Sequence, residues 1–230
     1  MKTYISGIRT AVEQRKRIRI PSFHKVIWFV SALIVIVIIL ALYIAPDNEI
    51  DFHFRKETGV ITALSAIFLA IASGLAGCSF FLSDKKSRKQ TIFWFLVMGA
   101  FLFLSMDEMM QFHERVGFWI DNNWLGPSQI FRNWNDAVVI LYGMGAVVFF
   151  AYFLPVIMRY PKLMELLGSA FVFYIVHTGI DSLSVVKANI NIIVEETCKV
   201  FSSGYFAIAM FVGLLGNIVI YNSGNENDMK

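Results

Sequence analysis

Long apolar stretches separated by short polar segments dominate the pattern of this chain. The six longest reach about 20 residues or more, enough for an α-helix to cross the ~30 Å of hydrocarbon in a bilayer. Because the runs are continuous rather than alternating, membrane β-strands are not expected. We predict an all-α polytopic bundle whose single transmembrane domain covers residues 26–221. The six predicted spans are residues 26–45, 59–82, 91–112, 137–158, 163–184 and 192–221.

The composition supports this class of protein. Hydrophobic residues make up 57% of the chain and charged residues 16%, whereas soluble domains usually hold about a quarter charged residues. The sequence contains no motif for nucleotide binding, nucleic-acid binding or a serine nucleophile. We therefore expect no nucleic-acid partner, and the lipid bilayer is the first partner that the composition predicts.

The basic residues predict the orientation of the bundle, since short cytoplasmic loops are enriched in Lys and Arg. Residues 1–25 hold seven of them, and the segments between spans two and three and between spans four and five add more. Both termini are therefore expected in the cytoplasm, which agrees with an even number of spans. We expect span one to be a retained, lipid-facing signal anchor, and residues 222–230 to be a disordered tail.

The N-terminal segment 1–25 has two open interpretations. Ile5, Ile8 and Val12 recur at helical spacing between basic residues, which is typical of an amphipathic helix on the anionic inner leaflet. A basic tail that only enforces topology gives the same pattern. In either case, the segment could contact lipid or a cytoplasmic protein partner.

The stretch SMDEMMQFHERVG ends span three and contains Asp107, Glu108, His113 and Glu114. Carboxylates at this depth in a membrane are costly, so each needs a partner or a function. On a continuous helix at 100° per residue, Asp107, Glu108, Gln111 and Glu114 share one polar face, and His113 lies on its flank.

The outer ends of two other spans carry ionisable residues at a comparable depth. His177 and Asp181 are four residues apart in span five and share a helix face. Glu195 and Glu196 open span six, followed by Lys199. We therefore predict that spans three, five and six form one site on the outer side of the bundle.

A mixture of imidazoles and carboxylates suits Zn, Fe or Mn. We predict a divalent-metal site with one of the three acids Glu114, Glu195 and Glu196 as the general base. The predicted metal ligands are Asp107, Glu108, His113, His177 and Asp181.

Other interpretations of these charges stay open. Several acids could be protonated, or Arg115 and Lys199 could neutralise part of the cluster, for example through a Glu195–Lys199 ion pair. Glu114 could be a solvated helix-end residue. Glu57 and Asp136 suit helix starts as capping residues.

The outer segment 115–136 is rich in tryptophan, with Trp119, Trp124 and Trp134. Tryptophan at this level is typical of the belt at a membrane–water interface. The segment could also close over the site as a lid or bind a protein partner. A homo-oligomer is compatible with the sequence.

The stretch SMDEMMQFHE resembles a pattern of uncharacterised bacterial polytopic membrane proteins, roughly L-S-x-D-E-x-x-x-x-H-E at the end of a span. Those proteins tend to have an acidic pair in the last span, which Glu195 and Glu196 match, followed by a third acid where this chain has Lys199. The resemblance implies a bacterial inner-membrane protein and no particular reaction. A more distant likeness to seven-span metal-dependent membrane hydrolases lacks their HxxxH pair, since HTGID has Asp181 at the second position.

Three functions follow as hypotheses. The first is a membrane-embedded, metal-dependent hydrolase that acts on a lipid or small amphiphile from the outer leaflet. The second is an ion-coupled or proton-coupled transporter, which the nearly apolar inner halves of the spans do not favour. The third is a non-catalytic sensory or structural subunit of a membrane complex.

Overall fold

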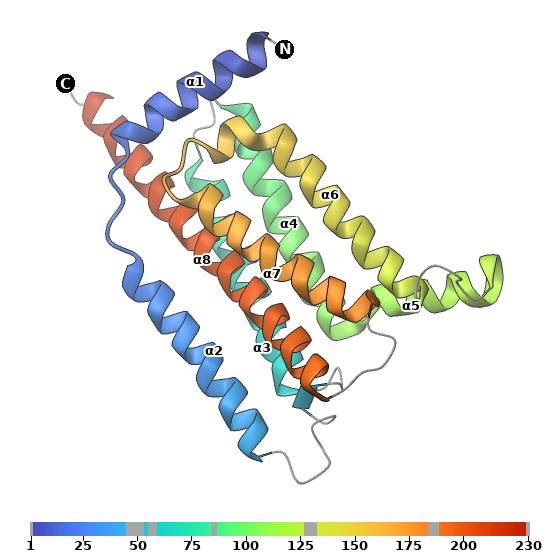
Figure 1. The fold of residues 1–230 in the computed structure, drawn as a ribbon. Coiled ribbons are helices and arrows are strands. Elements are labelled where there is room, and N and C mark those ends of the chain that lie inside the picture. The colour runs from blue at the N-terminus through green and yellow to red at the C-terminus, as the bar shows by residue number, and fades with distance from the viewer. Residues whose placement is uncertain are drawn as a thin grey trace.

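The computed structural model describes residues 2–44, 53–54, 59–83, 87–126, 133–183 and 189–228 of the chain. Within these ranges the chain is all helical (Figure 1). Six helices are long and apolar enough to cross a membrane, as expected for a multi-pass membrane protein, and the predicted all-α bundle is confirmed. The elements are α1 (Lys2–Arg17), α2 (His24–Ile44), α3 (Val60–Leu82), α4 (Arg88–Met110), α5 (Phe112–Ile120), the π-helix η2 (Asp121–Leu125), α6 (Trp134–Ile157), α7 (Leu163–Leu183) and α8 (Asn189–Asp228).

Apart from the C-terminal end of the last helix, every bound of the six long helices lies within three residues of the predicted span, and two differences matter for the description below. The third span ends at Met110 rather than at residue 112, because Gln111 adopts a left-handed conformation with φ 57°. The last helix continues to Asp228, so residues 222–228, expected to be part of a disordered tail, are helical. Glu57 and residues 127–132 of the tryptophan-rich segment lie outside the described residues.

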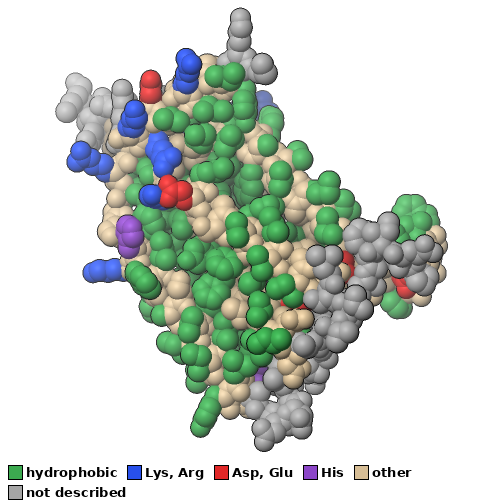
Figure 2. All heavy atoms as spheres, viewed as in Figure 1, with side chains coloured by type: hydrophobic (Ala, Val, Ile, Leu, Met, Phe, Trp, Pro, Cys, Tyr) green, Lys and Arg blue, Asp and Glu red, His purple; other side chains and the backbone are tan. Residues whose placement is uncertain are grey.

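The two termini lie at the same end of the bundle (Figure 1). We call this the inner end, following the orientation predicted from Lys and Arg, and the opposite end the outer end. On the face shown in Figure 2, the Lys and Arg side chains gather near the termini and the rest of the surface is largely hydrophobic. This distribution is the one expected of a bundle whose sides face lipid.

Helices α3 and α8 form the centre of the bundle. More than half of the apolar part of each of these two helices is buried inside the bundle, whereas the buried share is 17% for α2 and 11% for α6. Small residues let α3 pack closely, as its sequence predicted, with Ala72 and Ala76 fully buried. Helix α2 lies against the outside of α8, where Gly204 leaves room for Ile34. Several large apolar side chains of α2 are exposed on the outside of the bundle. That this helix is a retained, lipid-facing anchor stays a prediction.

A buried polar network ties the helices together at the inner end. Gln90 of α4 donates from Nε2 to the Tyr160 hydroxyl at 2.7 Å and to Asn217 Oδ1 of α8 at 2.9 Å. Arg159 donates to Gln90 Oε1 at 2.7 Å, and the Trp94 indole donates to the Tyr160 hydroxyl at 3.1 Å. Burial raises the pKa of Tyr160 to about 12, although these partners oppose that effect, so the phenol stays neutral.

Helix α1 packs across the inner end of α6. The Tyr4 hydroxyl donates to the Ala151 carbonyl at 2.6 Å, Gly7 lies next to Pro155, and Arg15 approaches Glu165 at 3.5 Å. The helical interpretation of this segment is therefore confirmed. Its placement on the anionic inner leaflet stays a prediction.

Two glycines of α8, Gly213 and Gly216, leave room for the Trp94 and Tyr160 rings of the inner network. A Cβ at Gly213 would overlap the buried Trp94 ring, so Gly213→Ala is expected to destabilise the protein by about 1–3 kcal/mol. Gly168 of α7 has open space around it, so Gly168→Ala should leave stability unchanged or raise it slightly. Thermal unfolding of both variants in the same detergent measures the difference, and equal midpoints would contradict the packing described here.

Candidate functional site

A cavity of about 280 Å³ lies at the outer end of the bundle, between α3, α4, α5, α6, α7 and α8. All the sequence-predicted site residues line it, so spans three, five and six do converge there. Seven of its lining residues are acids, and Lys199 is its only lysine or arginine among the described residues. The ionisable lining residues are Asp107, Glu108, His113, Glu114, Asp136, His177, Asp181, Glu195, Glu196 and Lys199.

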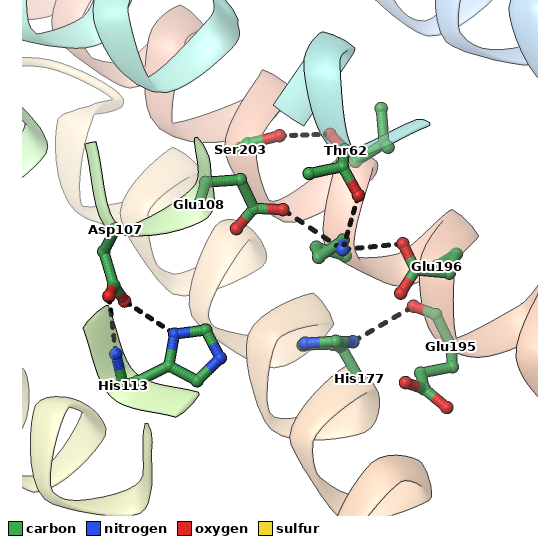
Figure 3. A network of polar contacts seen from close by, with 10 residues as sticks. Thr62, Asp107, Glu108, His113, His177, Glu195, Glu196 and Ser203 are labelled. Atoms are coloured by element: carbon green, nitrogen blue, oxygen red, sulfur yellow. Dashed lines mark hydrogen bonds and ion pairs between the residues drawn. The ribbon is translucent and has the colours of Figure 1, made fainter. Parts of the chain in front are cut away.

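Lys199 connects three helices on one side of the cavity (Figure 3). Its Nζ lies 2.7 Å from Glu196 Oε2 on its own helix and 3.1 Å from Glu108 Oε1 on α4. It also donates to the Thr62 hydroxyl of α3 at 3.4 Å. All three ionised side chains are at least four-fifths buried, so the positive charge offsets part of the cost of keeping the two carboxylates out of water.

Asp107 holds His113 through two contacts (Figure 3). Its Oδ1 accepts the His113 backbone N–H at 2.8 Å, and its Oδ2 lies 2.9 Å from His113 Nδ1. The left-handed Gln111 makes this possible because it ends α4 and starts α5 in a new direction. The predicted continuous polar face from Asp107 to Glu114 is therefore wrong beyond Met110, and His113 turns back toward Asp107 instead of lying on the flank.

His177 enters the cavity from α7. Its Nδ1 lies 3.3 Å from the Glu195 backbone carbonyl, so this nitrogen carries the hydrogen and donates it. With Nδ1 of each ring held by protein, Figure 3 shows the imidazoles of His113 and His177 pointing toward one another.

The other predicted residues also line the cavity. Glu114 lies in the first turn of α5, and Asp181 lies one turn after His177 on α7. Asp136 accepts the Asn133 backbone N–H at 3.4 Å, which supports its predicted role at the start of a helix. The side chain of Glu195 is almost fully buried.

Sequence analysis missed the two tyrosines of the site, Tyr142 and Tyr174, which line the cavity from α6 and α7. The Tyr174 hydroxyl donates to the Val139 carbonyl at 2.6 Å and links these two helices. Single tyrosines within apolar spans carry no signal that separates them from core residues. Thr62 was missed for the same reason.

The predicted metal-ligand set is only partly compatible with this geometry. Among the residues that the structure describes, no three His, Cys, Asp or Glu side chains are grouped so as to hold a metal ion. Asp107 is engaged with His113, and Glu108 with Lys199. The two imidazoles do fit, because metal-binding histidines usually donate their other ring N–H to a carboxylate or a backbone carbonyl.

The protonation of His113 depends on its acidic neighbours. Burial lowers the pKa of His113, but the hydrogen bond and charge of Asp107, with the charges of Glu114 and Glu108, outweigh burial and raise the pKa above its usual value. In the absence of a bound cation, the ring therefore gains a proton more readily than an ordinary histidine.

A family model described as a domain of unknown function (DUF8692) matches residues 32–214. The chain belongs to this family. The DUF8692 match begins within α2 and ends within α8, so it includes every residue of the site, whereas α1 lies outside it. Neither the comparison with curated proteins nor the comparison with solved structures finds a match.

The contact between Asp107 and His113 can be tested by titration. Asp107→Asn removes the carboxylate that raises the His113 pKa, so the pKa is expected to fall, as burial then has less opposing it. NMR of labelled histidine side chains in chelator-treated protein measures the change. Glu165→Gln at the inner end should leave the value unaltered, and an unchanged pKa in Asp107→Asn would contradict the contact.

Proposed function

We propose that the outer cavity is the active site of a membrane-embedded hydrolase that acts on a lipid or small amphiphile with the help of a divalent metal. The observation that carries this proposal is the pair of imidazoles, each held through Nδ1 and turned toward the other inside an acidic cavity. We also propose that the chain lies in a bacterial cytoplasmic membrane with both termini in the cytoplasm. The basic segments and the resemblance of SMDEMMQFHE support this location.

The charge balance of the cavity favours a bound cation. Seven acids face one lysine and two histidines, and so many carboxylates cannot all stay ionised together at low dielectric without positive charge. His113 and His177 would be two ligands of a Zn, Fe or Mn ion. A third would come from Glu114 or Asp181, each of which lies close in sequence to one of the histidines and lines the same cavity. Either side chain would first have to turn toward the two rings, since no three such groups are gathered for a metal among the described residues.

The chemistry at such a site can be assigned to residues. A divalent metal supplies Lewis-acid polarisation and lowers the pKa of water. Asp107 orients the His113 ring and fixes its tautomer, and the Glu195 carbonyl does the same for His177. Glu195 or Glu114 would accept the proton of the attacking water and pass it to the leaving group. Glu196 is less suited to this role, since it pairs with Lys199.

Hydrolysis at this site has a simple balance. The oxygen of one water molecule bonds to the carbonyl carbon of an ester or amide, and the bond from that carbon to the leaving oxygen or nitrogen breaks. One proton of the water ends on the leaving group. Lys199, nearly one turn beyond Glu196 along α8, would stabilise the negative charge that develops on the carbonyl oxygen.

The lining of the cavity suits an amphiphilic substrate. Beside the ionisable groups, apolar side chains from four helices complete the wall, and they could hold an acyl or alkyl chain. The apolar lining residues of these helices are Leu69, Leu104, Val139, Ile192 and Phe206.

A conduit across the membrane is less well supported. Hydroxyl groups along the central helices cross-link neighbouring backbones instead of forming a polar path. Ser73 donates to Met98 O, Ser105 to Ala66 O and Ser202 to Ala170 O, each at 2.9 Å. Buried aromatic side chains, among them Phe93, Trp94 and Phe101, fill the bundle further inward.

Metal analysis tests the proposed site. Chelator-washed protein that is reloaded with Zn, Fe(II) or Mn is expected to keep about one ion per chain, and His113→Ala and His177→Ala should lose it. Asp107→Asn should weaken binding about 10–100-fold, as expected for a residue that orients a ligand. His24→Ala is the matched control, because His24 is exposed at the inner end of α2. Folded wild-type protein that retains no metal would contradict the proposal.

Hydrolysis is tested separately with defined substrates. Protein reconstituted in phosphatidylcholine vesicles that also contain a lysophospholipid and a ceramide is expected to release fatty acid from at least one of the three, measured by mass spectrometry. His177→Ala should lower the rate by about 100-fold or more, whereas His24→Ala should not. If metal binds but none of these lipids is cleaved, the metal site stands and this substrate class is wrong.

A further inference from the structure

The segment formed by α5 and η2, residues 112–125, projects sideways from the outer end of the bundle, beyond the start of α6 (Figure 1). We call this segment the outer arm. Its direction differs from that of the six spans because the left-handed Gln111 separates it from α4. An arm that leaves the bundle at this level must lie near the outer boundary of the bilayer.

The base of the outer arm is fixed to the bundle. Gly117 packs so closely on the backbone of Asn135 that a Cβ would overlap it, and Phe112 stacks on Phe103 with ring centroids 6.2 Å apart. The Trp134 indole donates to the Gly126 carbonyl at 2.7 Å and ties the end of the arm to the start of α6. The arm therefore has a defined orientation relative to the spans.

One face of the arm is apolar. Phe112, Val116, Trp119 and Ile120 recur at the i, i+4, i+7, i+8 spacing of a helix face. Trp124 extends this face, with its ring centroid 6.3 Å from that of Trp119. Trp119 is 55% exposed and Trp124 is 75% exposed, and Figure 2 shows hydrophobic side chains at the tip of the arm.

At the end of the arm, two backbone carbonyls accept hydrogen bonds from side chains and so do not depend on water for a partner. Asn122 donates from its side chain to the Phe118 carbonyl at 2.8 Å, and Asn123 donates to the Trp119 carbonyl at 3.0 Å. Carbonyls at a helix end that enters the apolar part of an interface need such partners, because water is scarce there. Tryptophan is also the side chain most typical of this level of the bilayer.

We propose that the outer arm lies in the outer membrane–water interface, with Val116, Trp119 and Trp124 inserted among the lipid acyl chains and headgroups. The lipid surface that it meets is continuous with the lipid around α6, the helix on which the arm packs. That helix has Leu141, Met144 and Val148 exposed along its span. The arm then acts as a lateral anchor beside the cavity, and this inference does not depend on the proposed hydrolase.

Spin labelling tests the position of the arm. In a chain whose two cysteines are replaced, Cys78→Ser with Cys198→Ser, a nitroxide is attached at Val116→Cys or, as the matched control, at Asp121→Cys, which lies two residues after Trp119 and so on the opposite side of the arm from it. Both proteins are reconstituted in vesicles of equal parts phosphatidylcholine and phosphatidylglycerol. Collisions with oxygen, which concentrates in lipid, and with a water-soluble nickel chelate are then measured by EPR.

The expected result is a ratio of oxygen to nickel collisions several times higher at Val116 than at Asp121. Equal access of nickel to both labels would place the arm in water and overturn the proposal. A Val116 label shielded from both reagents would mean that protein covers this face, from a second copy or another partner, and would overturn it as well. Circular dichroism of each labelled protein checks that the helices are intact.

Discussion

The buried ammonium of Lys199 is the interaction on which the outer end of the bundle depends. It lies between carboxylates from two helices and bonds to a hydroxyl on a third. Without Lys199, the carboxylates of Glu108 and Glu196 would be buried without the positive charge that compensates them. Removing one partner of a buried ion pair commonly costs several kcal/mol. The same contacts draw α3, α4 and α8 together at the depth where the acids from α5, α6 and α7 converge.

The inner end is held by a different kind of chemistry. There the groups are neutral amides, a phenol and an indole, with Arg159 at the edge. The hydrogen bonds join α4, the turn between α6 and α7, and α8, which are far apart in sequence. These contacts hold the inner end mainly through neutral donors and acceptors, although Asn217 Nδ2 is buried there without a hydrogen-bond partner in the described part of the chain. The bundle is therefore closed at one end by hydrogen bonds and at the other by opposite charges, with an apolar core between the two.

Much of this arrangement could be predicted from the chain. Span number and the meeting of spans three, five and six follow from hydropathy and from where charges interrupt it, because both depend on the bilayer and not on detailed packing. The junction at Gln111 could not be predicted, since glutamine carries no strong preference for a left-handed conformation and a helical wheel assumes that the helix continues. The inner network was equally hidden, because Gln90, Tyr160 and Asn217 are single polar residues in unremarkable surroundings. Metal, substrate and membrane side rest on chemistry that a sequence pattern only suggests.

Because of the break at Gln111, the contact of His113 with Asp107 and the separation of His113 from His177 depend on different parts of the structure. Asp107 and His113 are six residues apart and joined through one turn of chain, so their contact moves as a unit with the end of α4. His177 belongs to α7, so its separation from His113 is set by how these helices lean against one another. Helices tilt to match the thickness of the hydrocarbon around them. We therefore expect the gap between the two imidazoles to follow bilayer thickness, while the orientation of the His113 ring, set within one short segment of chain, does not.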